Sequence, residues 1–193
     1  MDRRHLAWNK KKVAQDAENV LLTADEAGFN LLSSAMRTYA FHGCTPILQQ
    51  DCKYTHLSVI AAISPGGSII SDLRDSSFDG ASIVAFLRRL LATFQKEIHL
   101  IWDGANIHSC QAVRDFLSTE PQAKRLFLYR IPAYSPELNP TEQLWNNMKN
   151  VQLKNVFSKN RKQLEENVIK TLNSITDKKE LIAAFFRHPK VVF

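Results

Sequence analysis

Hydrophobic and polar positions follow two different patterns along this chain. In the first part, short apolar runs with strand character occur at 19–24, 37–42 and 55–63, and another begins at Ile69. The letters SPGG at 64–67 are a strong turn signal between the last two runs. This part of the chain therefore predicts an antiparallel meander of strands.

The second part alternates strands with helices. Apolar residues recur at helical spacing from Ile83 to Phe94, and the apolar run 98–102 then ends abruptly at Asp103. A meander followed by strand–helix alternation predicts the α/β class, with a mixed sheet and helices on its faces. The remaining expected elements are a helix around 111–117, a strand at 126–131, a helix from near Asn139, and helices at about 161–174 and 178–187.

The length of 193 residues fits one domain, or one domain with a helical appendage. We expect a basic lead-in helix at 1–18, a main domain at 19–155 and a C-terminal helical extension at 156–193 that packs on it. No apolar run approaches the roughly 18 residues that span a membrane, and no secretory signal is present, which predicts a cytoplasmic protein. Three cysteines without a C-x-x-C pair indicate reduced thiols rather than a disulfide framework or a zinc site.

Charge points to an anionic partner. The net charge is +6 and the pI about 9.3. No acidic residue occurs between Gln143 and Leu164, a stretch typical of a phosphate-binding surface, although solubilising charges on a surface helix would give the same composition. The basic residues in this stretch are Lys149, Lys154, Lys159, Arg161 and Lys162.

Three acidic residues stand where the backbone pattern changes. Asp25 and Asp103 each follow an apolar run, and Glu142 opens a helix after a proline-rich loop. Clustered carboxylates bind hard cations such as Mg²⁺ or Mn²⁺, and two such ions serve phosphodiester chemistry. Taken singly, either aspartate is more often a turn or cap residue. Glu142 also fits the third position of a capping box, with Asn139 as the N-cap and Pro140 as the first helical residue.

The helix that Glu142 opens is amphipathic. At about 100° per residue, Glu142, Asn146 and Lys149 share one polar face, which we expect to face a groove. An ordinary surface helix would show the same division. The opposite, sheet-facing side is predicted to hold Leu144, Met148 and Val151, with Trp145 at the border.

Residues near the three acids are further candidates. His108 follows Asp103 by five positions, and a lone histidine near the start of a helix is more often a cap or a hydrogen-bonded surface group than a ligand. Tyr134 lies in the rigid loop before the helix, which either grips a DNA backbone or only connects two elements. Glu137, in the same loop, is the rival to Glu142 as third carboxylate.

Three strings of the sequence resemble the DDE transposases of the mariner-like superfamily, and most of all their bacterial insertion-sequence six-thirty branch. The strings are ADEAGF (24–29), IWDGANIH (101–108) and IPAYSPELNPTEQLWNNMK (131–149). Shorter matches are GCTP (43–46) and LKN (153–155). The resemblance keeps its order from about Asp25 to Asn155, and the third string is the most specific.

The resemblance implies an RNase H-like fold and a catalytic triad. The family's acids fall on Asp25 rather than Glu26, on Asp103, and, in its N-P-x-E motif, on Glu142. It implies DNA cleavage and strand transfer at transposon ends with Mg²⁺ or Mn²⁺, two ions in all, and double-stranded DNA as the partner. The alternatives are a stand-alone or domesticated nuclease of the same fold and a catalytically silent DNA-binding remnant.

The implied partners and location complete these expectations. Only 24 residues precede Asp25, too few for the family's helix-turn-helix region, so a separate helix-turn-helix polypeptide or domain is expected to recognise the transposon ends. A homodimer is left open, no membrane is expected, and the location is cytoplasmic and nucleoid-associated. The residues expected to contact DNA are His108, Tyr134, Asn146, Lys149, Lys154, Lys159, Arg161 and Lys162.

Overall fold

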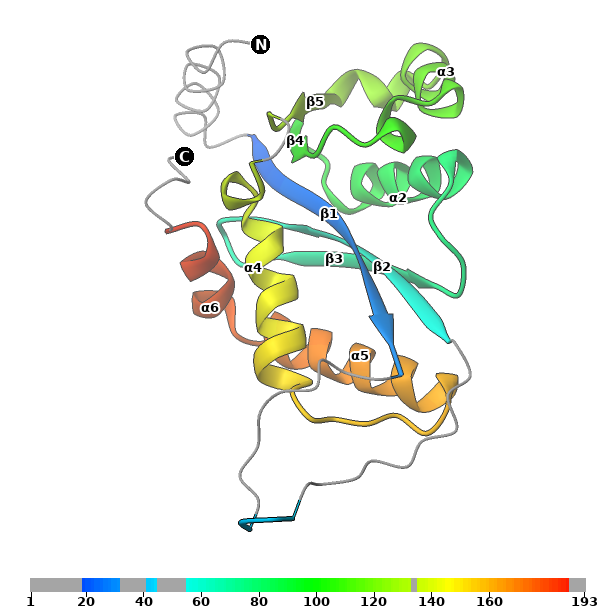
Figure 1. The fold of residues 1–193 in the computed structure, drawn as a ribbon. Helices are drawn as coiled ribbons and strands as arrows, with labels where there is room; N and C mark the ends of the chain where they lie inside the picture. Colours follow the sequence, from blue (N-terminus) through cyan, green and yellow to red (C-terminus); the bar gives the residue numbers. More distant parts are fainter. Residues whose placement is uncertain (1–18, 32–40, 45–54, 133–134, 188–193) are drawn as a thin grey trace.

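A computed structural model describes residues 19–31, 41–44, 55–132 and 135–187, and these form a five-stranded mixed sheet between two layers of helices (Figure 1). The strand order is β3-β2-β1-β4-β5. The first three strands pair antiparallel, and β4 and β5 run parallel to β1. The α/β class and the mixed sheet are therefore confirmed. The strands are β1 (Val20–Asn30), β2 (His56–Ile63), β3 (Ile69–Arg74), β4 (Ile98–Trp102) and β5 (Leu126–Arg130).

Strand β2 is buried on both of its faces because helices cover both sides of the sheet. Ile60 and Ala62 belong to the core on the α2 side, whereas Val59, Ala61 and Ile63 belong to the core on the α4 side. Side chains alternate between the faces of a strand, so one apolar run can fill two cores. The sheet thus separates two hydrophobic clusters.

The turn predicted at 64–67 joins β2 to β3. Ser64 closes it twice, since its carbonyl accepts from Gly67 N at 3.0 Å and its hydroxyl accepts from Ser68 N at 3.0 Å. Gly67 has a φ of 85°, a conformation that favours glycine. A Cβ at this position would lie 2.9 Å from the Cα of Lys179, so the turn also packs closely on the C-terminal part of the chain.

Two of the strand predictions need correction. Strand β1 does not end at Asp25 but continues to Asn30, because β2 pairs with it without interruption from Thr23 to Asn30. Residues 41 and 42, the end of the strand expected at 37–42, instead belong to a turn at 41–44. In this turn Cys44 N donates to Phe41 O at 2.9 Å. Residues 37–40 lie outside the described ranges.

One helical layer consists of α2 (Gly80–Thr93) and α3 (Gln111–Thr119), and it covers the face of the sheet that carries Ile60 and Ala62. Asp79 and Ser82 form a reciprocal capping box at the start of α2, which satisfies two otherwise unpaired amides. At the other end of α2, the guanidinium of Arg125 donates to the carbonyls of Leu91, Phe94 and Lys96. Short 3₁₀ turns at Asn106–Ser109 (η1) and Pro121–Arg125 (η2) flank α3.

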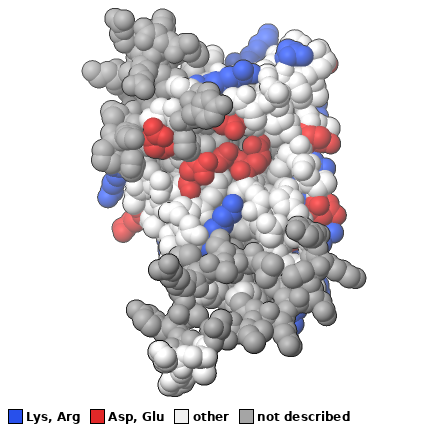
Figure 2. All heavy atoms as spheres, in the orientation of Figure 1, with Lys and Arg blue, Asp and Glu red and all other residues white. Residues whose placement is uncertain are grey.

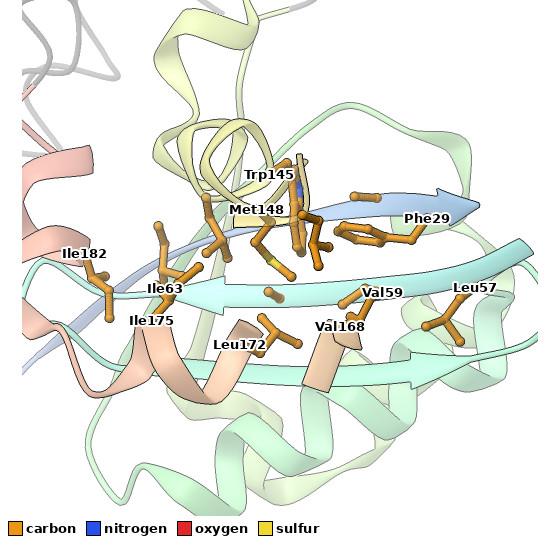
Figure 3. Close-up of a cluster of buried hydrophobic side chains, with 14 of the residues drawn as sticks. Phe29, Leu57, Val59, Ile63, Trp145, Met148, Val168, Leu172, Ile175 and Ile182 are labelled. Carbon is orange, nitrogen blue, oxygen red and sulfur yellow. The ribbon is translucent and has the colours of Figure 1, made fainter. Parts of the chain in front are cut away.

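The other layer covers β1 and β2 with three helices, and Figure 3 shows its packed interior. Met148, Val168, Leu172 and Ile182 meet the sheet residues there. The predicted C-terminal helices are thus present and share one core with the sheet. The elements of this layer are a 3₁₀ turn at Pro136–Leu138 (η3), α4 (Pro140–Asn147), a π-helical turn at Met148–Gln152 (η4), α5 (Arg161–Thr176) and α6 (Lys179–Phe185).

The π-helical turn changes which residues face the sheet. Leu153 N donates to Met148 O, a hydrogen bond over five residues, so the chain is wound more widely here than in an α-helix. Leu144 and Met148 are buried as expected, but Val151 is 61% exposed. The prediction for Val151 is wrong because it assumed 3.6 residues per turn throughout.

The predicted domain limits at 18, 155 and 156 stay predictions. The lead-in helix at 1–18 lies outside the described residues, whereas α5 and α6 pack into the core that β2 and α4 also fill. Among the helices that the structure describes, none combines the length and the apolar character that a membrane crossing needs.

Candidate active site

Asp25 and Asp103 are brought together by the pairing of β1 with β4. The two strands run parallel, and their last paired residues are Thr23 and Ile101. Asp25 and Asp103 each come two positions later, so they stand side by side where β4 ends and β1 continues. Parallel strands therefore place at one point two residues that are 78 positions apart in the sequence.

Asp25 is a buried carboxylate in an acidic environment. Its side chain faces α4, the residue is 8% exposed, and its Oδ2 atom accepts a hydrogen bond from Trp145 Nε1 at 3.0 Å. Burial and, after it, the nearby carboxylates of Glu142, Glu26 and Asp103 together raise the pKa of Asp25 to about 7, while the Trp145 hydrogen bond opposes the shift. Near neutral pH this carboxyl group is thus poised between its two protonation states.

The start of α4 is fixed on β1 by polar contacts. Asn139 is the N-cap, as predicted, and its side chain accepts from Thr141 N at 3.1 Å and donates to Ala24 O at 3.4 Å. The Thr141 hydroxyl donates to Thr23 O at 2.9 Å. These contacts hold the first turn of the helix, which carries Glu142, against the strand that carries Asp25.

Glu142 is exposed, and it lies close enough to Asp25 to raise the pKa of that carboxyl. Its backbone amide donates to Asn139 O rather than to the Asn139 side chain, which caps the amide of Thr141 instead. A capping box needs the side chain of the N-cap on the third amide. The cap recorded here therefore differs from the capping-box alternative.

Each aspartate has one oxygen held by the protein. Oδ1 of Asp103 accepts from Ala105 N at 3.0 Å and lies 2.9 Å from His108 Nδ1, while Oδ2 of Asp25 accepts from Trp145. Within the described ranges, no hydrogen bond is recorded for Oδ1 of Asp25 or Oδ2 of Asp103. Both carboxylates are thus oriented, and each has an oxygen available to a ligand.

His108 connects Asp103 to Glu26. Its side chain is 0% exposed, its Nε2 lies 2.9 Å from Glu26 Oε1, and its ring stacks on Trp102 at 4.1 Å between centroids. Burial alone would lower the pKa of His108, but Glu26 and Asp103 outweigh burial and hold it above its ordinary value. The enclosed ring favours the hydrogen-bonded alternative for His108, and its expected contact with DNA stays a prediction.

The donors at this place suit a hard cation. Glu26, Asp103 and His108 each offer one ligand atom, and these atoms lie within 4.8 Å of one another. With Asp25 and Glu142 nearby, four carboxylates and one imidazole surround the junction of β1, β4 and α4. Figure 2 shows the acidic side chains gathered near the middle of one face of the molecule. Carboxylate oxygens are the ligands that Mg²⁺ and Mn²⁺ prefer.

Asn146 and Lys149, which were expected to share a polar helix face with Glu142, lie in different surroundings. Asn146 is exposed, and its Oδ1 accepts from Asn150 Nδ2 at 2.7 Å. The ammonium group of Lys149 lies 5.2 Å from the centre of the Phe29 ring, a cation–π contact near the far end of β1. Tyr134 lies outside the described residues.

Within the described part of the chain, Arg161 is the member of the predicted basic surface that forms an ion pair. Lys154, Lys159 and Lys162 are exposed. Arg161 is also exposed, but its Nη1 forms an ion pair with Asp75 Oδ2 at 2.9 Å. The three lysines are accordingly the better candidates for phosphate contacts.

Two residues of this site were not selected from the sequence. Glu26 was set aside in favour of its neighbour, although alternation along a strand places Glu26 on the opposite face, where it meets His108. Trp145 was assigned to the border of a helix face, although its position three residues after Glu142 already made the two residues neighbours on the helix surface. No local signal indicated its hydrogen bond to Asp25.

A five-stranded sheet of this order, with acidic side chains at the junction of β1 and β4, is an RNase H-like fold, which the solved structures below share. The family described as DDE superfamily endonuclease matches residues 20–165. This match covers most of the chain, and the chain belongs to that family.

One relative and two solved structures are also similar to this chain. The chain is 31% identical over 86 residues to the insertion element IS630 uncharacterized 39 kDa protein of Shigella sonnei, which is 44% of this chain and 24% of that protein. The catalytic domain of Mos1 mariner transposase matches with a TM-score of 0.59 at 15% identity, over 95% of this chain and 94% of that one. The Mos1 strand transfer complex matches with a TM-score of 0.65 at 17% identity, over 93% of this chain and 58% of the Mos1 chain.

Proposed function

We propose that this chain is the catalytic domain of a transposase. In this proposal it hydrolyses a DNA strand at a transposon end, which releases a 3′-OH, and then joins that 3′-OH to a phosphodiester of target DNA. The observation that carries the proposal is the group of carboxylates around the buried Asp25, whose pKa is raised to about 7 by burial and by these carboxylates. Across the described residues, no lysine or arginine forms an ion pair with Asp25, Asp103 or Glu142.

Such a group of like charges is stabilised by a bound cation. Asp25, Asp103 and Glu142 would hold Mg²⁺ or Mn²⁺ through oxygen, in agreement with the Mos1 structures that are described with Mg and with Mn. Two ions, when bound, activate the attacking oxygen and stabilise the leaving one in phosphodiester chemistry. The contribution of the chain itself is orientation, since Trp145 holds Asp25, and Ala105 and His108 hold Asp103.

DNA is the proposed substrate and partner. The net charge of +6 and the exposed Lys154, Lys159 and Lys162 favour binding to phosphates that flank the acidic site. Recognition of transposon ends by a separate helix-turn-helix polypeptide or domain stays a prediction, as does a homodimer. The Mos1 structures matched include a paired-end complex with a transposon end, which is consistent with this kind of substrate.

Nicking of supercoiled plasmid DNA in Mg²⁺ or Mn²⁺ tests this function. We expect the unaltered chain to nick, Asp103→Asn to lose at least 100-fold in rate while still binding DNA, and the exposed Asp115→Asn on α3 to behave as the unaltered chain. Nicking that persists in Asp103→Asn would contradict the site. A 3′-OH oligonucleotide then tests joining: cutting without joining indicates a stand-alone nuclease, and binding without cutting indicates a silent remnant.

A further inference from the structure

Three groups fix the orientation of the His108 imidazole. Nδ1 lies 2.9 Å from Oδ1 of Asp103, Nε2 lies 2.9 Å from Oε1 of Glu26, and the ring is parallel to Trp102 within 3°. Carboxylates only accept hydrogen bonds, so both ring nitrogens act as donors in this arrangement. A fully buried ring with two charged partners has little freedom to rotate.

The contact with Asp103 selects one of its two oxygens. Both the imidazole and the amide of Ala105 reach Oδ1, and His108 Nδ1 also lies 3.3 Å from the carbonyl of Asp103. The hydrogen bond from Ala105 and the close approach of the His108 ring nitrogen to Oδ1 fix the side-chain rotamer and leave Oδ2 as the oxygen that a ligand can reach. The Asp103 side chain is itself 50% exposed, so it would rotate freely without such contacts.

We propose that His108 is a positioning residue for Asp103, which fixes the carboxylate so that Oδ2 faces the cation, and that Glu26 holds His108 in turn. This inference rests on the proposed function, because it requires that Asp103 bind a metal ion. It gives a role to Glu26, which lies next to Asp25 in the sequence but points to the opposite face of β1. Partners that orient a metal ligand commonly change metal affinity by 10–100-fold.

The competing role for His108 is direct metal ligation. The same three residues could share an ion, since their ligand atoms lie within 4.8 Å of one another. In that case one imidazole nitrogen would lose its hydrogen-bonding proton and bind the ion. Nε2 forms a hydrogen bond with Glu26, and Nδ1 forms one with the Asp103 carbonyl while lying at ion-pair distance from Asp103 Oδ1. Since both ring nitrogens are engaged in this way and hard cations prefer oxygen, positioning is the role that the contacts favour.

Substituting His108 by Asn or by Gln distinguishes the effect of its contact with Asp103 from the effect of its contact with Glu26. Asn at position 108 can place an N–H near the position of Nδ1, towards Asp103, whereas Gln reaches towards the position of Nε2 and Glu26. We expect His108→Ala to weaken Mn²⁺ binding about 10–100-fold, measured on the full chain by electron paramagnetic resonance of free Mn²⁺. His108→Asn should bind about tenfold more tightly than His108→Gln. Glu26→Gln, which keeps an acceptor for Nε2 but removes a negative charge beside the site, should weaken Mn²⁺ binding less than His108→Ala does.

Several results would overturn the positioning role. Equal Mn²⁺ affinity in the Asn and Gln variants would show that the contact with Asp103 does not matter, and unaltered affinity in His108→Ala would remove the role altogether. A ¹⁴N modulation of the Mn²⁺ spin echo in the unaltered chain, lost in His108→Gln, would make His108 a ligand instead. If His108 variants bind normally while Asp103→Asn does not, only this inference fails, whereas absence of Mn²⁺ binding by the unaltered chain contradicts the proposed function itself.

Discussion

Trp145 donates its indole N–H to Oδ2 of Asp25 at 3.0 Å, so the buried carboxylate is held by a neutral donor and not by a cation. The same ring meets Phe29 edge-on, with 6.1 Å between centroids and 75° between planes (Figure 3). Trp145 follows Glu142 by less than one helical turn on α4. One short helix thus supplies both an acid of the site and the group that orients another acid.

Trp145→Phe is expected to shift metal binding towards higher pH. The variant keeps an aromatic ring against Phe29 but removes the N–H that lowers the pKa of Asp25, so that pKa rises above about 7. A hydrogen bond to a charged group that contributes about 1.4 kcal/mol corresponds to a tenfold effect. Mn²⁺ affinity at pH 7 should therefore fall about 3–10-fold and recover by pH 9. A profile that does not move between pH 6 and 9 would contradict the role of Trp145.

Asp25→Asn should abolish nicking but stabilise the metal-free protein at alkaline pH. The folded pKa of about 7 lies above the unfolded value of 3.8, so between these pH values the folded state keeps a proton that the unfolded state has released. Stability of the unaltered chain falls as pH rises through this window. The Asn variant lacks the effect and should be more stable at pH 8, by at most about 4 kcal/mol.

Urea denaturation in the presence of a chelator measures this difference at pH 4 and at pH 8. The two proteins should differ less at pH 4, which lies close to the unfolded pKa of 3.8, because there Asp25 is protonated in the folded state and also in a large fraction of unfolded molecules. Adding Mn²⁺ at pH 8 should stabilise the unaltered chain and not the variant, because a ligand that binds only the folded state raises its stability. If the stability of the two proteins changes with pH in the same way across this range, the pKa of Asp25 is not raised in the folded state.

Lys159→Ala/Lys162→Ala should weaken DNA binding for every sequence alike. Each phosphate contact releases a condensed counterion, so loss of two contacts lowers the magnitude of the log K versus log[salt] slope by about 1.8. Lys124→Ala is the control, since Lys124 is exposed in η2, on the α2 and α3 side of the sheet. Arg161 is omitted because its substitution would also break the ion pair with Asp75. Equal slopes for the double variant and the unaltered chain would indicate solubilising charges only.

Gly67→Ala should destabilise the fold, whereas Gly66→Ala should not. A side chain at Gly67 would adopt a φ of 85° and lie 2.9 Å from the backbone of Lys179, while the nearest atom to a Cβ at Gly66 is 3.7 Å away. Backbone strain of this kind costs about 1–3 kcal/mol. Urea denaturation of the two variants at one pH compares them directly. Similar midpoints would mean that α6 does not press on the β2–β3 turn.

Local patterns were enough to predict the elements that local interactions determine. The abrupt end of β4 before Asp103 and the Asn139-Pro140 start of α4 were both predicted, because an apolar run and a cap are short-range signals. The end of β1 was not predicted, since two consecutive acids hid the alternation that continues through Ala27 and Phe29. Both of those residues are buried on the face that Asp25 occupies.

Contacts between distant residues could not be predicted in the same way. Glu26 meets His108 across 82 positions, and Asp25 meets Trp145 across 120, so neither pair has a spacing that identifies it. The position of Val151 depended on a hydrogen-bond pattern and not on composition, since the π-helical turn begins only at Met148. The backbone pattern made Asp25, Asp103 and Glu142 candidates, the family resemblance implied that they form the triad, and their role in catalysis stays a proposal.

The long pairing of β1 with β2 has a consequence for the two neighbouring acids. It joins eight residue pairs, from Thr23 opposite Ile63 to Asn30 opposite His56. A slip of one residue would turn every side chain to the other face, so that Asp25 would face α2 and Glu26 would face α4. Odd or even position along the strand therefore assigns each carboxylate to its side of the sheet. Inserting or deleting a single residue between Val20 and Asp25 would exchange the two assignments while leaving the composition of the site intact.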